Sequence, residues 1–310
     1  MAHPQRVART VAMAATASAI AVLALRHRTD TTGWSASAGV IVDGPLPAHV
    51  VGRGPIRVVL LHGMFNSGRY WGSAYDSVAG DGRSVAPDLL GFGRGPRPSD
   101  GYTAVAHADA VADTLHHRGV DGPIVVAGHS VGALVAIRLA TQHPDLVAGV
   151  VAIAPPLHRD PESARTHIAR IDPLAGLLVA NTDLAARACA LMCRHRTAAA
   201  TAVRLLRPDL PGPLADDRVE HSWASYSQTL SNLVLTAEAS SWLAEIAVPV
   251  RILAGRDDDS LDHQHLAELA DRHDHVTLDR LPGGHDLPLA APEQCLAAIR
   301  DTLADVDARR

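Results

Sequence analysis

The sequence predicts an α/β protein with a mostly parallel, doubly wound sheet and an inserted helical cap. Short, continuous runs of Val, Ile and Leu indicate strands that are buried on both faces. Segments with helical character separate most of these runs, and strands that alternate with helices require crossover connections in a parallel sheet. The predicted strands are 58–61, 85–87, 124–127, 150–153, 250–254 and 276–278.

The remaining elements follow from the same patterns. Residues 38–42 and 49–51 predict an antiparallel pair at the sheet edge. Residues 157–242 contain no strand-like run and are rich in Ala and Leu, so we interpret them as a cap of several short helices. The predicted core helices are 104–118, 131–142, 263–273 and 292–305. The predicted division is an N-terminal arm or hydrophobic helix (1–37), a core (38–156 and 243–310) and the cap (157–242).

The composition excludes several classes of function. The chain has 310 residues, 47% of them hydrophobic, and its formal charge of -5 comes from well-mixed residues, so nucleic-acid binding is not expected. All 28 basic residues are arginines, which excludes a Walker loop and a Schiff-base lysine. The three cysteines form no C-x-x-C pair, so neither a disulfide framework nor a zinc site is indicated.

The N-terminus carries a candidate targeting segment. An apolar run at 10–25 lies between Arg9 and Arg26, and its 16 residues are fewer than the about 18 to 20 that span a bilayer. Arg26 and Arg28 directly after the run also disfavour a signal peptide. We therefore expect a cytoplasmic protein, with membrane association or export through residues 10–25 as the alternative.

The central motif is Gly128-His129-Ser130-Val131-Gly132, a G-x-S-x-G sequence between a predicted strand and a predicted helix. A sharp strand-to-helix turn holds the serine in a strained conformation, with its hydroxyl above the sheet, and the two glycines leave the space that the turn needs. The motif predicts that Ser130 is a nucleophile. The alternative is an ordinary glycine-rich turn with an N-capping serine.

A serine hydroxyl needs a base and an orienting acid, which follow the nucleophile in the order acid then histidine in this arrangement. An acidic run at 257–259 follows one predicted strand, and His285 follows the next, after Gly283-Gly284. Both loops leave the carboxyl ends of strands, where open α/β sheets place their ligands. We predict His285 as the general base and one aspartate of the run as its partner.

Two backbone amides are predicted to bind the oxyanion of the tetrahedral intermediate. Val131 supplies the N–H after the nucleophile. Met64 supplies the second from the loop after the first parallel strand, where Gly63 lets the backbone turn. His62 is predicted to be a packing and hydrogen-bonding residue instead of a second base.

The whole pattern resembles the α/β-hydrolase superfamily over roughly residues 39–303, and within it the capped esterases and the meta-cleavage product hydrolases. This resemblance implies the α/β-hydrolase fold, and it favours Asp258 as the acid with Asp257 in reserve. Haloalkane dehalogenases and epoxide hydrolases use an aspartate nucleophile, which Ser130 excludes. The motifs that carry the resemblance are His62-Gly63-Met64, Asp88-Leu89-Leu90-Gly91-Phe92-Gly93, Gly128-His129-Ser130-Val131-Gly132, Gly255-Arg256-Asp257-Asp258 and Gly284-His285.

The expected function is hydrolysis of an ester, or a related carbonyl compound, of a small to medium apolar molecule through an acyl-enzyme. The same triad also serves carbon–carbon bond hydrolysis and cofactor-free perhydrolysis, and the fold also occurs in non-catalytic ligand-binding receptors.

No cofactor is implied, because the Gly-x-Gly pairs lack a dinucleotide fingerprint, and no metal, because His263 and His265 are not spaced to share a helix face. A cap arginine aimed at the pocket would favour a carboxylate-bearing substrate; the candidates are Arg165, Arg170, Arg187 and Arg194.

Overall fold

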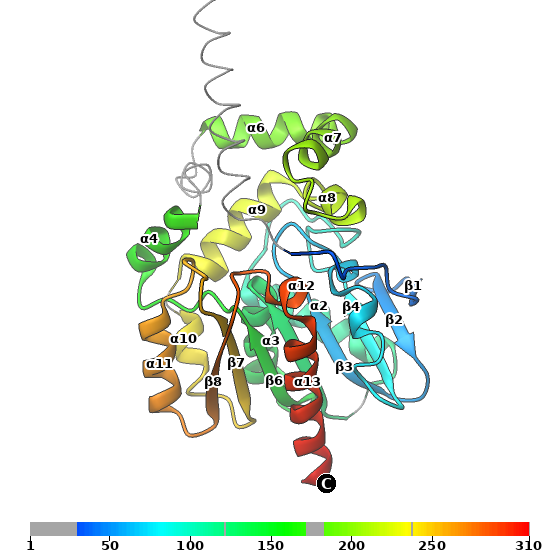
Figure 1. The fold of residues 1–310 in the computed structure, drawn as a ribbon, viewed down its shortest axis with the longest axis vertical. Coiled ribbons are helices and arrows are strands. Elements are labelled where there is room, and N and C mark those ends of the chain that lie inside the picture. The colour runs from blue at the N-terminus through cyan, green and yellow to red at the C-terminus, as the bar shows by residue number, and fades with distance from the viewer. Residues whose placement is uncertain (1–29, 121, 172–182, 237, 310) are drawn as a thin grey trace, which may run out of the picture.

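The computed structural model describes residues 30–120, 122–171, 183–236 and 238–309. Its centre is an eight-stranded sheet with the order β1-β2-β4-β3-β5-β6-β7-β8 (Figure 1). The pairs β1–β2 and β2–β4 are antiparallel, and all other neighbours are parallel. The strands are β1 (Val40–Val42), β2 (Ala48–Gly52), β3 (Ile56–Leu61), β4 (Arg83–Pro87), β5 (Ile124–His129), β6 (Val147–Ile153), β7 (Val250–Gly255) and β8 (Val276–Leu281).

Helices cover both faces of this sheet, which explains why its central strands are apolar without alternation. Every residue of β5 is buried. One face packs against α2, α3, α10 and α11, and the other against α12, α13 and two short 3-10 helices. These elements are α2 (Ala104–His117), α3 (Val131–Gln142), α10 (Glu238–Trp242), α11 (His263–Arg272), α12 (Leu287–Ala290), α13 (Pro292–Ala308), η1 (Gly68–Trp71) and η2 (Ser73–Tyr75).

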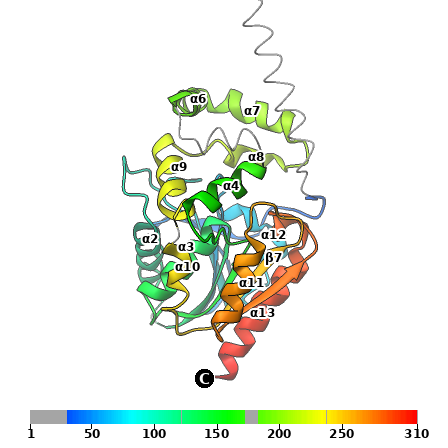
Figure 2. The same ribbon diagram turned by 90° about the vertical axis from the view of Figure 1, so that its left-hand side faces the viewer.

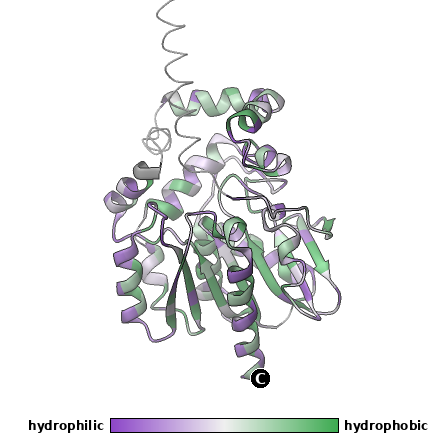
Figure 3. Cartoon of the chain, in the orientation of Figure 1, coloured by the Kyte–Doolittle hydropathy of each residue, from purple (hydrophilic) through white to green (hydrophobic). Residues whose placement is uncertain are grey.

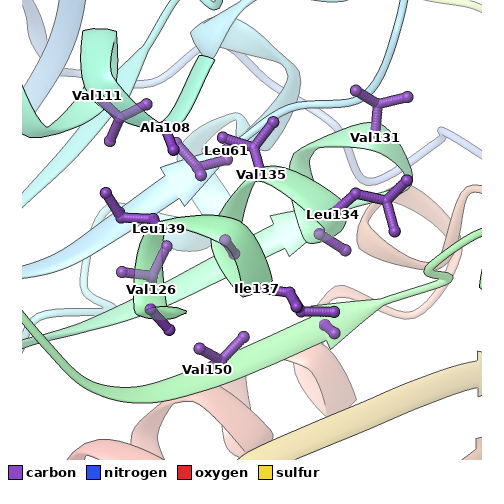
Figure 4. Packing of buried hydrophobic residues seen from close by; sticks show 14 of the residues in the cluster. Leu61, Ala108, Val111, Val126, Val131, Leu134, Val135, Ile137, Leu139 and Val150 are labelled. Carbon is purple, nitrogen blue, oxygen red and sulfur yellow. The ribbon is translucent and has the colours of Figure 1, made fainter. Parts of the chain in front are cut away.

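The helix α3 contributes a large part of the core. Its residues Leu134, Val135 and Leu139 are fully buried and lie against the sheet near Val126 and Leu61 (Figure 4). Truncating one such leucine to alanine costs about 2 to 5 kcal/mol of stability in other proteins. This packing fixes the axis of α3, and therefore the position of Ser130, which is the residue directly before its first turn and makes no side-chain capping bond.

The interval between β6 and β7 is helical, and most of it lies beyond the end of the sheet, with α6 and α7 farthest from the strands in both views (Figure 2). Its last helix, α10, instead packs on α3 of the core, where the Arg138 guanidinium lies 5.4 Å from the centre of the Trp242 ring. The other elements are α4 (Pro161–Ile171), α6 (Asp183–Arg194), α7 (Arg196–Leu206), α8 (Gly212–Asp217), α9 (Trp223–Thr229) and the π-helix η3 (Leu230–Val234).

The predicted N-terminal unit falls mostly outside the described residues, and this includes the apolar run at 10–25. Its last residues, from Asp30 onward, contact the body of the protein: the indole of Trp34 donates to the Tyr70 carbonyl at 3.2 Å. Among the residues that the structure describes, none of the helices has the length and apolar character that crossing a bilayer requires.

Candidate active site

The structure brings Ser130, Asp258 and His285 together at the carboxyl ends of β5, β7 and β8. The Ser130 Oγ lies 3.0 Å from His285 Nε2, and His285 Nδ1 lies 2.8 Å from the Asp258 carboxylate. The reserve candidate, Asp257, is exposed, and its backbone amide donates to the Gly283 carbonyl. Of the two aspartates that the sequence proposes, it is therefore Asp258 that meets the histidine.

The turn that carries Ser130 has the strained geometry that its sequence predicts. Ser130 has φ 53° and ψ -120°, in a region that residues other than glycine rarely occupy. A Cβ atom at Gly128 would lie 2.2 Å from the Gly132 carbonyl oxygen, and one at Gly132 would lie 2.3 Å from the Leu61 carbonyl oxygen. The two glycines are thus required by close backbone approaches on both sides of the serine.

Ser260 adds a contact that sequence reasoning missed. Its hydroxyl and its backbone N–H both donate to Asp258 Oδ1, and its Oγ lies 3.1 Å from His285 Nδ1. The second carboxylate oxygen of Asp258 is left for the histidine. A single serine two residues after the aspartate is too common a pattern to identify this role from the sequence.

The charges in this site favour a carboxylate beside a basic imidazole. Burial raises the pKa of Asp258, but the charge and hydrogen bond of His285 and the bonds of Ser260 outweigh it, so the pKa lies below its ordinary value. Burial lowers the pKa of His285, but the Asp258 charge and hydrogen bond dominate, and the pKa is raised above 6.5. The pair therefore stabilises the imidazolium that forms when the histidine takes a proton.

His129 contacts the backbone of His285 and helps to hold it in position. Its Nε2 lies 2.9 Å from the His285 carbonyl oxygen, and its ring stacks on Tyr70 with centroids 5.1 Å apart. Burial, with the nearby His285 charge, lowers the pKa of His129 to about 4, so at neutral pH the ring carries one N–H, and that N–H is available to the His285 carbonyl. Tyr70 in turn donates to the Asp286 carboxylate at 3.0 Å.

The predicted oxyanion loop lies beside the nucleophile. A Cβ atom at Gly63 would lie 3.1 Å from the Ser130 Cβ, which shows how closely the two loops approach. Met64 and Val131 line the same cavity as Ser130. His62 is buried, accepts a hydrogen bond from the Leu89 amide at 2.9 Å and contacts the Gly63 carbonyl at 2.7 Å, which confirms its predicted packing and hydrogen-bonding role.

The site opens into a cavity of about 280 Å³ between the core and the helical insertion. Apolar side chains make up most of its wall, and the insertion contributes Ile168, Tyr226, Val234 and one arginine, Arg218. Among the arginines named from the sequence, Arg165, Arg187 and Arg194 are exposed and do not line this cavity. The side chain of Arg170 lies outside the described residues.

Arg218 follows α8 and places a positive charge near the histidine. Its Nε atom is buried and has no hydrogen-bond partner among the described residues. Its charge opposes the rise in the pKa of His285. Within the described part of the chain, no group of three or more His, Cys, Asp or Glu side chains is arranged to hold a metal ion.

Comparison with known proteins gives a consistent result. A family model described as alpha/beta hydrolase fold matches residues 56–292. Lipase LipV of Mycobacterium tuberculosis (strain ATCC 25618 / H37Rv) is 40% identical over 112 residues, which is 36% of this chain and 42% of the relative. The probable lysophospholipase BODYGUARD 2 of Arabidopsis thaliana is 30% identical over 114 residues, which is 35% of this chain and 24% of the relative. The chain thus matches less than half the length of these curated relatives.

Solved structures extend the likeness over most of the fold. An E-2-(acetamidomethylene)succinate hydrolase has a TM-score of 0.66 at 20% identity and covers 84% of this chain and 95% of its own. A thermophilic esterase from Thermogutta terrifontis has a TM-score of 0.58 at 20% identity and covers 88% of this chain and 99% of its own. At these identities the likeness shows the fold alone. Because the family model spans more than half of the chain, the protein belongs to the α/β hydrolase fold family.

Proposed function

We propose that the protein is a serine hydrolase that cleaves carboxylic esters of small to medium, largely apolar molecules through an acyl-enzyme. The observation that carries the proposal is the continuous chain of contacts from Ser130 Oγ through His285 to Asp258 at 3.0 and 2.8 Å. A hydroxyl held on a strained turn, within reach of an imidazole that a buried carboxylate orients, is an arrangement for nucleophilic attack on a carbonyl carbon.

The chemical steps follow from these positions. Ser130 Oγ attacks the ester carbonyl carbon while its proton passes to His285 Nε2, and Asp258 stabilises the resulting imidazolium. The backbone N–H groups of Met64 and Val131 are the proposed donors to the oxyanion. The imidazolium then gives its proton to the leaving alcohol, and water activated by His285 releases the acid from Ser130.

The volume and the lining of the cavity indicate the size and polarity of the substrate. At about 280 Å³ it lies near the lower end of small-molecule sites, and its wall is mainly apolar. A short or medium acyl chain fits this volume better than a bulky polycyclic group. A panel of p-nitrophenyl esters of increasing chain length measures this directly, and the expected optimum of kcat/KM lies at short to medium chains.

A fluorophosphonate probe tests the nucleophile itself. The native protein is expected to label rapidly at one serine, and Ser130→Ala is expected not to label at all. Ser67→Ala is a matched control, because Ser67 is also a buried serine but donates to Asp217 instead of contacting His285. Equal labelling of Ser130→Ala and the native protein would remove the basis for the proposal. A native protein that labels but hydrolyses no ester would favour carbon–carbon hydrolysis, perhydrolysis or a receptor role.

Arg218 favours a carboxylate-bearing substrate as a second candidate within the same chemistry. Within the described part of the chain its buried Nε has no partner, although guanidinium groups bind carboxylates strongly and often through two hydrogen bonds. Arg218→Gln is expected to lower kcat/KM for a monoester of a dicarboxylic acid by about 10- to 100-fold, the loss of one charge-assisted hydrogen bond. The neutral ester of equal length should be little affected, and equal losses on both substrates would contradict this role.

A further inference from the structure

The outer face of α6 and α7 carries exposed apolar side chains that no part of the described protein covers. Seven large hydrophobic side chains are exposed among the described residues, and four of them lie on these two helices. Leu191 is 62% exposed and Leu205 is 77% exposed. We call this surface the α6–α7 face, and it consists of Leu191, Met192, Leu205 and Leu206.

The orientation of α6 explains why these side chains point outward. Its buried residues Ala185 and Cys189 face the rest of the insertion. Leu191 is two residues beyond Cys189, which places it about 200° around the helix, on the opposite side. Arg187 and Arg194 stand four residues before and three residues after Leu191, so they share its side of the helix. The outer side of α6 therefore presents an apolar residue between two cations.

The helix α7 presents a similar surface. It is an amphipathic helix that buries none of its residues, although its sequence is rich in Ala and ends in Leu205-Leu206. In a globular protein, the apolar side of such a helix normally packs on a core. Figure 3 shows α6 and α7, at the end of the molecule away from the sheet, with green apolar residues along much of their length and purple polar residues between them.

The charge of this region identifies the kind of partner that fits it. Residues 183–207 contain five arginines and one aspartate, a formal charge of +4 in a chain whose total is -5. Arg196, Arg204 and Arg207 pair with acids within the insertion. Arg187 and Arg194 are exposed and form no ion pair within the part of the chain that the structure describes. An apolar face bordered by unpaired cations matches the surface of an anionic lipid bilayer.

The first described residues of the chain are attached at the same end of the molecule. The Thr31 hydroxyl donates to the Asp209 carbonyl, three residues after α7 ends. The apolar run at 10–25 ends six residues before Thr31, and six residues reach at most about 20 Å. A short stretch of chain therefore joins the run to Thr31 at this end of the molecule, and stable attachment to a membrane generally requires two such signals together.

We propose that the α6–α7 face docks on an anionic lipid bilayer, with Leu191 and Leu205 entering the interface and Arg187 and Arg194 contacting anionic headgroups. The docked protein turns the helical insertion, and the cavity beneath it, toward the membrane. Docking uses none of the residues of the proposed triad, so it stands apart from the ester chemistry.

The test is sedimentation of the full chain with vesicles of phosphatidylcholine alone or mixed equally with phosphatidylglycerol. The native protein is expected to bind the mixed vesicles more tightly. The double variant Leu191→Ser, Leu205→Ser should lower the lipid partition coefficient by about tenfold or more. Val40→Ser is the matched control, because Val40 is 63% exposed but lies on β1, and it should leave the coefficient unchanged.

The role of charge is tested in the same assay by comparing the double variant Arg187→Gln, Arg194→Gln with Arg272→Gln, which removes an exposed arginine of α11. The double variant should reduce binding to mixed vesicles toward the level on phosphatidylcholine, and Arg272→Gln should not. Ser130→Ala is expected to sediment like the native protein, which separates this proposal from the proposed function.

Two results would overturn the proposal. Equal partition of the double leucine variant and the native protein would assign any binding to residues 10–25 alone. If the native chain binds no vesicles but forms a concentration-dependent dimer, and the double leucine variant stays monomeric, the α6–α7 face would be assigned to contact with a second copy.

Discussion

Replacing Asp258 by asparagine is expected to slow ester hydrolysis by about four powers of ten. The Asp258 carboxylate lies 2.8 Å from His285 Nδ1, and asparagine removes the negative charge that this contact brings to the imidazolium. For unit charges at this separation, Coulomb's law with an effective dielectric constant of about 20 gives about 6 kcal/mol. A barrier raised by that amount slows the reaction about 10⁴-fold. Asparagine also offers an N–H group to Nδ1, which favours the unproductive tautomer.

The assay is kcat for a p-nitrophenyl ester on the alkaline plateau of the native protein's pH–rate profile. Asp257→Asn is the matched control, because this exposed aspartate of the same loop keeps its backbone bond to Gly283 whichever side chain it carries. It should retain activity within about twofold, and thermal unfolding of both variants checks that they fold. A rate for Asp258→Asn within tenfold of the native rate, or a larger loss in Asp257→Asn, would refute the reasoning.

Three further predictions concern pH and the supporting side chains. The kcat/KM of the native protein should rise through a pKa above 6.5, because Asp258 raises the pKa of His285; no rise between pH 6 and 8 would contradict this. Ser260→Ala should lower kcat by about 10- to 100-fold, the effect of one hydrogen bond to a charged group, and Ser260→Thr should restore most of it, unlike a purely structural defect. Burial raises the pKa of Asp217 from 3.8 to about 6, so the folded state holds its proton more tightly than the unfolded state. The stability that this protonation contributes is complete below pH 4 and is lost as the pH rises through 6. In urea unfolding, the free energy of unfolding of Asp217→Asn relative to that of the native protein should therefore increase by up to about 3 kcal/mol between pH 4 and pH 8. An equal difference at both pH values would contradict this prediction.

The sequence predicts the sheet well because its strands are short and wholly apolar. Residues 124–127 have no polar alternation, and they form β5, a strand buried on both faces. The edge pair is also recovered as β1 and β2. The strand order is less accessible, because β2 pairs with β4 instead of with its neighbour β3, and that choice depends on contacts far apart in the chain.

The insertion shows a second limit of sequence patterns. Its lack of strands is visible in the composition, and the structure has helices throughout the described part of it. The pattern does not reveal that α10 packs on α3, because the contact of Trp242 with Arg138 joins residues about a hundred positions apart. Helical periodicity identifies the element but not its partner.

The residues of the candidate site also differ in how well the sequence predicts them. Ser130 and His285 are marked by glycines whose spacing reflects the local backbone, so a single sequence suffices to locate them. Ser260, His129 and Arg218 act through tertiary contacts and have no local pattern. Arg218 was absent from the four arginines proposed from the sequence, since nothing in a helical stretch tells which cation faces inward.

The position of β8 at the border of the sheet has a consequence for how the protein fails on heating. Among the described strands, β8 pairs only with β7, and the loop that follows it carries His285. Local opening of a border strand requires less free energy than unfolding of the central strands. Catalytic output should thus vanish at a lower temperature than the far-ultraviolet circular dichroism signal, and recover on cooling, because the outermost ribbon detaches before the interior melts.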